Sequence, residues 1–142
     1  YTNLMKYLLI ISCLLFTFVG CSKTVDTYDL EERGGLYYEK FSDVPFTGKV
    51  DGEEQGKIIK GKREGKWLFY YESGQLNKKG NYKNGKREGE WLVFHHSGKL
   101  KEKGNFIDGK EEGEFLYYRY NGSLKSKSNY KDGEHMGGQY IR

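Results

Sequence analysis

Proline, cysteine and long hydrophobic runs are scarce in this chain, and each scarcity excludes a class of protein. Its 142 residues include one proline, two cysteines and 20 glycines, and the glycines follow no strict every-third pattern, so a collagen triple helix is excluded. A charged fraction of 31% and a mean hydropathy of −0.85 exclude a polytopic membrane protein. Neither sign of charge dominates, because 24 basic residues face 20 acidic ones, so we expect no nucleic-acid partner.

Aromatic residues are abundant. The chain has 13 Tyr, 8 Phe and 2 Trp, which is too much apolar surface for a chain disordered by composition. Aromatic and glycine richness with almost no proline favours strands and tight turns. We therefore predict an all-β fold, in one domain or one short repeat array.

The first twenty residues have the pattern of a signal peptide. Residues 7–19 are apolar and uncharged, and Lys6 precedes them as a basic start. This stretch is shorter than the ~20 residues that a membrane-spanning helix needs, and it has the length of a signal-peptide core. The alternative is a buried apolar strand.

The end of this stretch resembles the lipobox of bacterial lipoprotein precursors. Val19, Gly20 and Cys21 match that motif, whereas Phe18 stands where the family usually has Leu. The resemblance implies a signal peptide over residues 1–20, cleavage after Gly20 and lipid attachment to Cys21. Two acyl chains anchor firmly where one does not. An ordinary secretory signal is the alternative.

This resemblance also implies a location. The protein is expected in the cell envelope, held to the membrane through the lipid on Cys21. Ser22 is not an aspartate, which by resemblance to Gram-negative lipoproteins implies the outer membrane in such a cell. Cys13 leaves with the signal, so the remaining Cys21 cannot form an internal disulfide.

Residues 21–40 are predicted to be the lipidated cysteine and a linker, with residues 22–32 as a polar tether. Gly34 and Gly35 indicate a turn, followed by a short strand over residues 36–38. Residues 41–142 are predicted to form the ordered array.

Within this array the chain repeats every 24 residues, with clear copies at residues 65–88, 89–112 and 113–136. Each copy has three parts in order: Gly-x-aromatic, then Tyr or Phe followed by x-x-Gly-x-Leu, then Asn-Tyr/Phe-x-x-Gly. This pattern resembles the bacterial variant of the MORN repeat. The resemblance implies a β-hairpin array without catalytic residues, and some bacterial members carry an antitoxin label. A fixed period of this length independently indicates stacked supersecondary units.

Turn motifs predict the strand register. Asn84-Gly85, with its counterparts one and two repeats on, predicts two-residue type I′ turns, and Ser73-Gly74 is a weaker signal of the same length. Such turns produce an antiparallel meander. They place Gly80 opposite both Trp67 and Gly89, and Trp91 opposite Gly104. We therefore expect the strand glycines, those at the start of each copy included, to lie beneath aromatic rings.

The same register assigns the two faces of the sheet. One face is predicted to be the core, and its residues are Trp67, Phe69, Leu76, Tyr82, Trp91, Val93, Leu100, Phe106, Phe115, Tyr117, Leu124 and Tyr130. The other face carries charged residues, including the predicted pairs Lys79–Glu90 and Lys103–Glu114. Across it runs an apolar row that we name the Leu/Tyr stripe: Leu68, Tyr70, Leu92, Phe94, Leu116 and Tyr118.

A single sheet cannot leave its hydrophobic core face exposed to water. Either the sheet curls on itself or the N-terminal strands fold over it. We expect curling, with a weaker repeat near residues 45–64 closing one end. The last strand, containing Tyr140 and Ile141, is expected to be an exposed edge.

No residues suggest catalysis, a metal or a cofactor. His95 and His96 are adjacent on a strand, so they point to opposite faces and cannot share one metal ion. No Ser, Cys or Thr lies in a nucleophile motif. Acidic residues are numerous, Glu88, Glu90 and Glu111 among them, and a solvated face is the ordinary explanation of them. We expect a protein that is not an enzyme.

The Leu/Tyr stripe is the candidate binding surface. Lys79, Lys103 and Lys127 are predicted opposite its leucines, and Lys101 and Lys125 opposite its aromatic rings. Aromatics beside cations suit anionic or sugar-like ligands. In the competing interpretation the lysine stems merely cover the stripe, or the stripe is a second small core.

These observations predict a lipid-anchored envelope protein that acts as a non-catalytic binding or scaffold module, with a protein or an envelope glycan as its partner. Two alternatives are retained. One is an antitoxin or immunity-type partner of a toxin, and the other is a polysaccharide-processing enzyme of the envelope.

Overall fold

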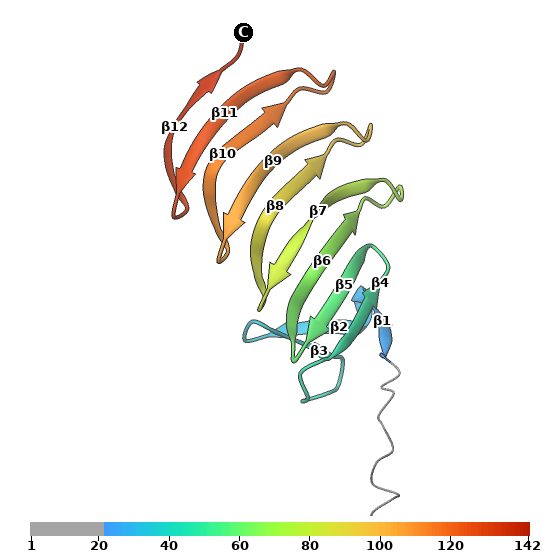
Figure 1. Cartoon of the computed structure of the whole chain (residues 1–142). Helices are drawn as coiled ribbons and strands as arrows, with labels where there is room; N and C mark the ends of the chain where they lie inside the picture. Colours follow the sequence, from blue (N-terminus) through green and yellow to red (C-terminus); the bar gives the residue numbers. More distant parts are fainter. Residues whose placement is uncertain (1–21) are drawn as a thin grey trace, which may run out of the picture.

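The protein is an open, mostly antiparallel sheet with a small hairpin at one end (Figure 1). The computed structural model describes residues 22–142. Its strands are β1 (Thr24–Asp26), β2 (Leu30–Arg33), β3 (Leu36–Glu39), β4 (Gly48–Asp51), β5 (Glu54–Ile59), β6 (Lys62–Tyr70), β7 (Leu76–Lys83), β8 (Lys86–Phe94), β9 (Leu100–Ile107), β10 (Lys110–Tyr118), β11 (Leu124–Lys131) and β12 (Glu134–Tyr140). Thr27–Asp29 form a 3-10 turn. Within residues 22–142, no helix has the length and apolar character needed to cross a membrane.

Strands β4 to β12 pair in sequence order, which confirms the predicted all-β meander. β1 adds a parallel strand beside β4, and β2 pairs with β3 in a separate two-stranded sheet. The expected tether over residues 22–32 is therefore largely ordered structure. Val25 explains this, because it lies opposite Val50 and is buried with it in the core. The predicted signal peptide and Cys21 lie outside the described residues.

The two-residue turns at one end of the hairpins are confirmed. Asn84 and Gly85 both have positive φ, at 52° and 82°, and the counterpart turns at Asp108 and Asp132 share this geometry. Each turn is also tied to the hairpin before it. The Asn84 N–H donates to the Glu64 carboxylate at 2.8 Å, and the Gly85 N–H donates to the Arg63 carbonyl at 3.0 Å. The turns thus contribute hydrogen bonds between repeats as well as reversing the chain.

At the other end of the hairpins the predicted two-residue turns are wrong. The Tyr71 N–H donates to the Gln75 carbonyl at 2.9 Å, and the Gly74 N–H donates to the Tyr71 carbonyl at 2.8 Å, so the loop has three residues. A bulge follows at once, because the register shifts between Phe69 and Tyr70. The bulge restores the predicted pairing of Trp67 with Gly80, and Trp91 pairs with Gly104 in the same way.

A second bulge explains why the predicted pairing of Gly80 with Gly89 does not occur. Gly89 has a φ of 72°, and the β7–β8 register shifts beside it. The shift swings Trp91 back over the preceding strand, so that a methyl group on Gly80 would lie 2.2 Å from the Trp91 ring. Nothing lies within 4 Å of a methyl group on Gly89. The first glycine of each copy therefore serves backbone conformation and is not under a ring, contrary to the prediction.

The ring that covers each strand glycine comes from the following strand. Trp67 covers Gly56, Trp91 covers Gly80 and Phe115 covers Gly104. For Gly104 the predicted cover was Trp91, its direct cross-strand partner. The correction follows from the positive-φ bulge, which the turn spacing alone does not reveal.

These rings form one continuous aromatic ladder along the core face. Trp67 is 1% exposed and Phe115 is fully buried. Adjacent rings meet mostly edge to face, with centroids 5.0–6.3 Å apart, in the order Trp67, Tyr82, Trp91, Phe106, Phe115 and Tyr130. Edge-to-face contacts add to the free energy gained by burial itself. The aromatic residues predicted for the core face are confirmed there.

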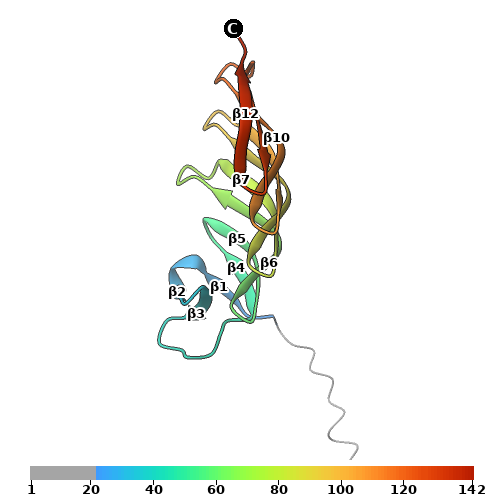
Figure 2. The same ribbon diagram turned by 90° about the vertical axis from the view of Figure 1, so that its left-hand side faces the viewer.

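The sheet does not curl into a closed structure. Figure 2 shows it as a single layer, with the β2–β3 hairpin against one end of the core face. Tyr37 and Leu30 of this hairpin pack on the core, and the Tyr37 N–H donates to the Gly61 carbonyl at 2.9 Å. Farther along, arginine covers the rings: the Arg87 guanidinium carbon lies 4.8 Å from the centroid of Trp91. The expectation of curling is therefore wrong, and the N-terminal strands cover one end only.

We predict that Gly104→Val destabilises the protein by about 1–3 kcal/mol, because a side chain there overlaps the Phe115 ring. A methyl group at this position already lies 2.1 Å from that ring. Urea unfolding followed by tryptophan fluorescence measures the change. The neighbouring Asn105→Val is the control, since Asn105 is exposed. Equal effects of the two variants would contradict the covering of Gly104 by Phe115.

Candidate functional site

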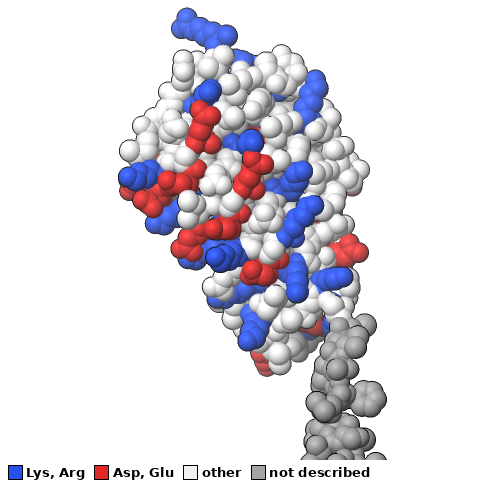
Figure 3. Space-filling model, viewed as in Figure 1, with Lys and Arg blue, Asp and Glu red and all other residues white. Residues whose placement is uncertain are grey.

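The Leu/Tyr stripe lies on the face opposite the aromatic ladder, as predicted. Its members come from the last third of β6, β8 and β10, and each is half-buried. Figure 3 views this face and shows uncharged surface running between acidic and basic groups. Figure 2 shows no element of residues 22–142 layered over it. Neighbouring side chains of the same sheet therefore account for the half-burial. No element of residues 22–142 covers the stripe from the solvent side.

Three leucines belong to this surface and not to the core face. Leu76 pairs with Tyr70, Leu100 with Phe94, and Leu124 with Tyr118. Directly opposed residues of antiparallel strands share a face, so these leucines lie beside the aromatic rings of the stripe. The prediction placed them in the core because it assumed two-residue loops, and the bulge after each three-residue loop moves them by one position. Lys101 and Lys125 consequently do not face the rings.

We call the enlarged set the extended stripe: Leu68, Tyr70, Leu76, Leu92, Phe94, Leu100, Leu116, Tyr118 and Leu124. It consists of two rows. In one row leucines alternate with lysines across the sheet, since Lys79 lies between Leu68 and Leu92, and Lys103 lies between Leu92 and Leu116. In the other row aromatic rings alternate with leucines. The predicted positions of the lysines opposite the leucines are confirmed.

Ion pairs hold these lysines beside the stripe. Lys103 Nζ lies 2.6 Å from Glu90, and Lys127 Nζ lies 3.4 Å from Glu114. The predicted pairing of Lys103 with Glu114 is wrong because the glycine bulge displaces each glutamate toward the following strand. Lys79 does not bond Glu90; its ammonium lies 5.7 Å from the centroid of the Phe94 ring. Exposed pairs of this kind contribute about 0–1 kcal/mol each.

Hydrogen bonds between repeats, which the sequence pattern did not indicate, brace one end of the stripe. The Tyr71 hydroxyl donates to the Phe94 carbonyl at 2.8 Å, and His95 Nε2 lies 3.1 Å from the Tyr118 carbonyl. Arg119 reaches the Ile141 carbonyl at 2.6 Å in the same way. These three side chains occupy one position of the repeat. They fix the spacing of the aromatic rings from repeat to repeat.

The two histidines have different neighbours. His96 stacks on Tyr71 of the previous repeat at a centroid distance of 3.6 Å, whereas His95 lies against Tyr120 of the next repeat. Among residues 22–142, no group of three His, Cys, Asp or Glu is placed to hold a metal ion.

One carboxylate lies among the aromatic rings of the core face. Glu102 is opposite Val93 on one side and Tyr117 on the other, and it is half-buried. Burial raises the pKa of the Glu102 carboxyl, and the negative charge of Glu111 raises it further. Burial also raises the pKa of the Tyr117 hydroxyl. The sequence pattern does not indicate Glu102, because lysine occupies the same position of the previous repeat.

We predict that Glu102→Gln stabilises the protein at neutral pH and has little effect in acid. The folded-state pKa lies above the ordinary value of 4.5, so the protonated carboxyl is favoured in the fold. The contribution of Glu102 is therefore favourable below that value and is lost as the pH rises through the raised pKa. Thermal unfolding at acidic and neutral pH tests this, with the loop variant Glu72→Gln as control. A gain of equal size at both pH values would contradict the assignment.

Comparison with known proteins identifies the repeats. The family model described as MORN repeat variant matches residues 63–84, 87–108 and 111–132. The matched segments cover β6 to β11 apart from the first residue of β6, β8 and β10, so the extended stripe lies on three hairpins that match the MORN repeat variant. Repeats of this kind are generally binding or scaffold modules and are typically non-catalytic. No curated protein matches the chain.

Proposed function

We propose that this protein is a lipid-anchored component of the cell envelope that binds a partner protein through the extended stripe and has no catalytic role. The observation that carries the proposal is the stripe itself. Half-buried apolar side chains recur at the same positions of three repeats, on a face that is not the core. Repeat arrays that present such rows suit extended partners.

The composition of the extended stripe favours a protein surface over a glycan. Sugar rings bind flat against open aromatic faces. Here each aromatic ring has a leucine directly opposite it on the next strand, as Phe94 has Leu100. Alternating leucine and aromatic side chains with a charged rim form the kind of patch that recognises another protein. Lys103 and Lys127, already paired with glutamates, supply that rim.

The anchoring part of the proposal is supported by the sequence before the fold. Residues 7–19 and the motif that ends at Cys21 resemble a lipoprotein precursor apart from Phe18, and the first described strand begins at Thr24. A lipid on Cys21 would thus hold the sheet close to the membrane surface. The MORN repeat variants support a scaffold or binding role for the part of the chain that follows.

We predict that Cys21→Ala releases the protein from the membrane fraction or leaves the precursor unprocessed. The reason is that the variant lacks the thiol to which the lipid would attach. Membrane fractionation and the mass of the mature chain measure the outcome. Cys13→Ala is the matched control and should behave as wild type. A Cys21→Ala protein that still fractionates and migrates like wild type would refute the lipid anchor.

We also predict that the triple change Tyr70→Ser, Phe94→Ser and Tyr118→Ser abolishes partner capture and leaves the fold intact. The rings are half-buried at the surface and lie outside the aromatic ladder that forms the core. Circular dichroism and crosslinked pull-down from intact membranes measure the two effects. Ile107→Ser with Met136→Ser is the control, because both residues are exposed and lie outside the extended stripe.

The outcomes of this experiment separate the interpretations of the stripe. Loss of capture with a native spectrum, and normal capture by the control, supports the binding surface. Loss of folding would show that the stripe is a second core. Unchanged capture would leave the stripe without a role in binding.

A further inference from the structure

The loop between β3 and β4 presents apolar side chains to solvent. Phe41 is 105% exposed and Val44 is 72% exposed, and the two residues between them, Ser42 and Asp43, are polar. Neither residue belongs to the core cluster or to the extended stripe. Exposed apolar residues are common singly, but two on one short loop require an explanation.

The backbone conformation at Phe41 is also unusual for a bulky residue. Phe41 has a φ of 64°, in the left-handed region that bulky side chains rarely adopt. Glycine or asparagine would adopt it more readily. The loop therefore keeps an unfavourable residue that gains no burial in return. Such an arrangement points to a ligand that contacts the Phe41 ring when the protein is at its site in the cell.

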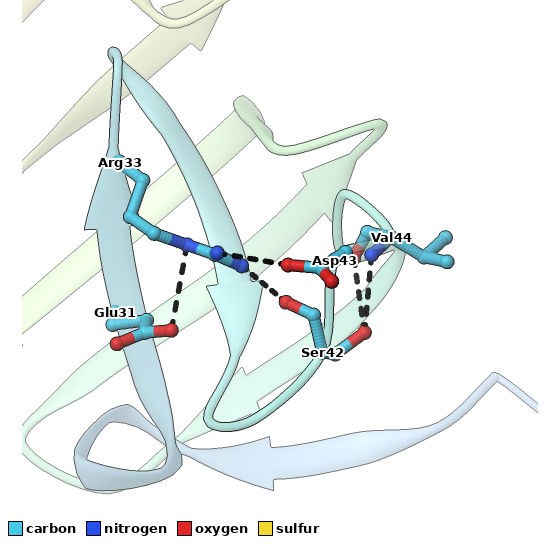
Figure 4. A network of polar contacts seen from close by, with 5 residues as sticks. All are labelled: Glu31, Arg33, Ser42, Asp43 and Val44. Atoms are coloured by element: carbon cyan, nitrogen blue, oxygen red, sulfur yellow. Dashed lines mark hydrogen bonds and ion pairs between the residues drawn. The ribbon is translucent and has the colours of Figure 1, made fainter.

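An arginine clamp holds the loop in this shape (Figure 4). The Arg33 guanidinium donates to the Asp43 carboxylate at 3.1 Å and to the Ser42 carbonyl, and it lies 3.4 Å from Glu31. The Val44 N–H donates to the Ser42 hydroxyl at 3.2 Å. Asp43 and the Ser42 carbonyl contact Arg33, whereas Phe41 and Val44 stay exposed and outside the core cluster.

The loop is also tied to the start of the fold. Lys23 Nζ lies 2.5 Å from Glu39, which is two residues before Phe41, and the Lys49 N–H donates to the Lys23 carbonyl at 2.8 Å. Cys21 precedes Lys23 by two residues, a chain length of at most about 7 Å. Figures 1 and 2 show that β1 begins at the same end of the molecule as the β3–β4 loop. A lipid on Cys21 would therefore bring Phe41 to the membrane surface.

We propose that Phe41 and Val44 insert into the interfacial region of the lipid bilayer beside the anchor and so fix the orientation of the sheet. This inference rests on the lipid anchor of the proposed function. Aromatic and branched side chains suit the boundary between headgroups and acyl chains. Lys40 directly precedes Phe41 and can meet lipid phosphates. The sheet would then project from the membrane with the extended stripe accessible along its length.

Fluorescence of the full-length, processed protein in phosphatidylethanolamine and phosphatidylglycerol vesicles tests the insertion. The variant Phe41→Trp adds one exposed indole, whereas the native Trp67 and Trp91 are buried. Acyl chains brominated near the headgroup should quench the added emission strongly. Tyr140→Trp is the matched control, because Tyr140 is 76% exposed on the last strand and should not be quenched.

A second variant separates insertion from stability. Phe41→Gly removes the ring and suits the positive φ, so the melting temperature should rise or stay unchanged. The same change should make the sheet more accessible to added protease on vesicles, because the loop no longer fixes its orientation. Protection equal to that of wild type would overturn the proposal.

Mass spectrometry of Cys21 in the same preparation distinguishes failure of the lipid anchor from failure of the loop insertion. If Cys21 carries lipid and the tryptophan at position 41 is not quenched, the loop insertion is wrong and the anchor stands. If Cys21 carries no lipid, the anchor and the insertion fail together. If Cys21 carries lipid and quenching occurs at position 41 but not at position 140, both the anchor and the insertion are supported.

Discussion

The packing of an aromatic ring on a strand glycine is the interaction on which the rest of this structure depends. Trp91 lies over Gly80 and Phe115 over Gly104, each ring reaching back to the preceding strand. The reach is possible because Gly89 and Gly113 adopt positive φ two residues earlier and bulge the strand. Trp67 covers Gly56 in the same way, so the contact joins successive hairpins from β5 to β10, and Ser128 replaces the strand glycine in the third copy.

This contact allows a single-layered sheet to bury a core. Most domains need a second layer to cover a hydrophobic face. Here the rings pack edge to face along the sheet and cover one another, and Arg63 and Arg87 complete the cover over Trp67 and Trp91. Only the first strands require a separate cover, because Ile58 and Val50 have no ring at the equivalent place, and the β2–β3 hairpin supplies it with Tyr37.

Much of the fold could be predicted from the sequence because the turn chemistry is local. Asn84 and Gly85 adopt positive φ values, which asparagine and glycine tolerate better than other residues, and the register follows from that turn as far as the next irregularity. The bulges were not predictable in this way. Gly89 resembles any strand glycine in sequence, and its φ is selected by the fit of Trp91 onto Gly80, which is a tertiary contact.

The difference between local patterns and tertiary contacts also explains which residues of the candidate site could be predicted from the sequence. Tyr70, Phe94 and Tyr118 follow strict alternation from the core rings, so their face could be read from the sequence. Leu76, Leu100 and Leu124 lie beyond a three-residue loop and its bulge, and an error of one residue moved them to the wrong face. The Arg33 clamp and the backbone of Phe41 depend on contacts between β2 and the β3–β4 loop, which no local pattern encodes.

Side chains alternate between the two faces of the sheet along each strand, but the packing requirements of the two faces differ. On the core face a ring must fit a glycine, so Gly104 and Phe115 depend on each other. On the other face no such partner exists within residues 22–142, and the half-buried rings there are free of that requirement. Their recurrence is therefore not explained by the packing that holds the repeats together. The proposed partner would supply a constraint, because binding would favour apolar side chains at the same positions of the three repeats.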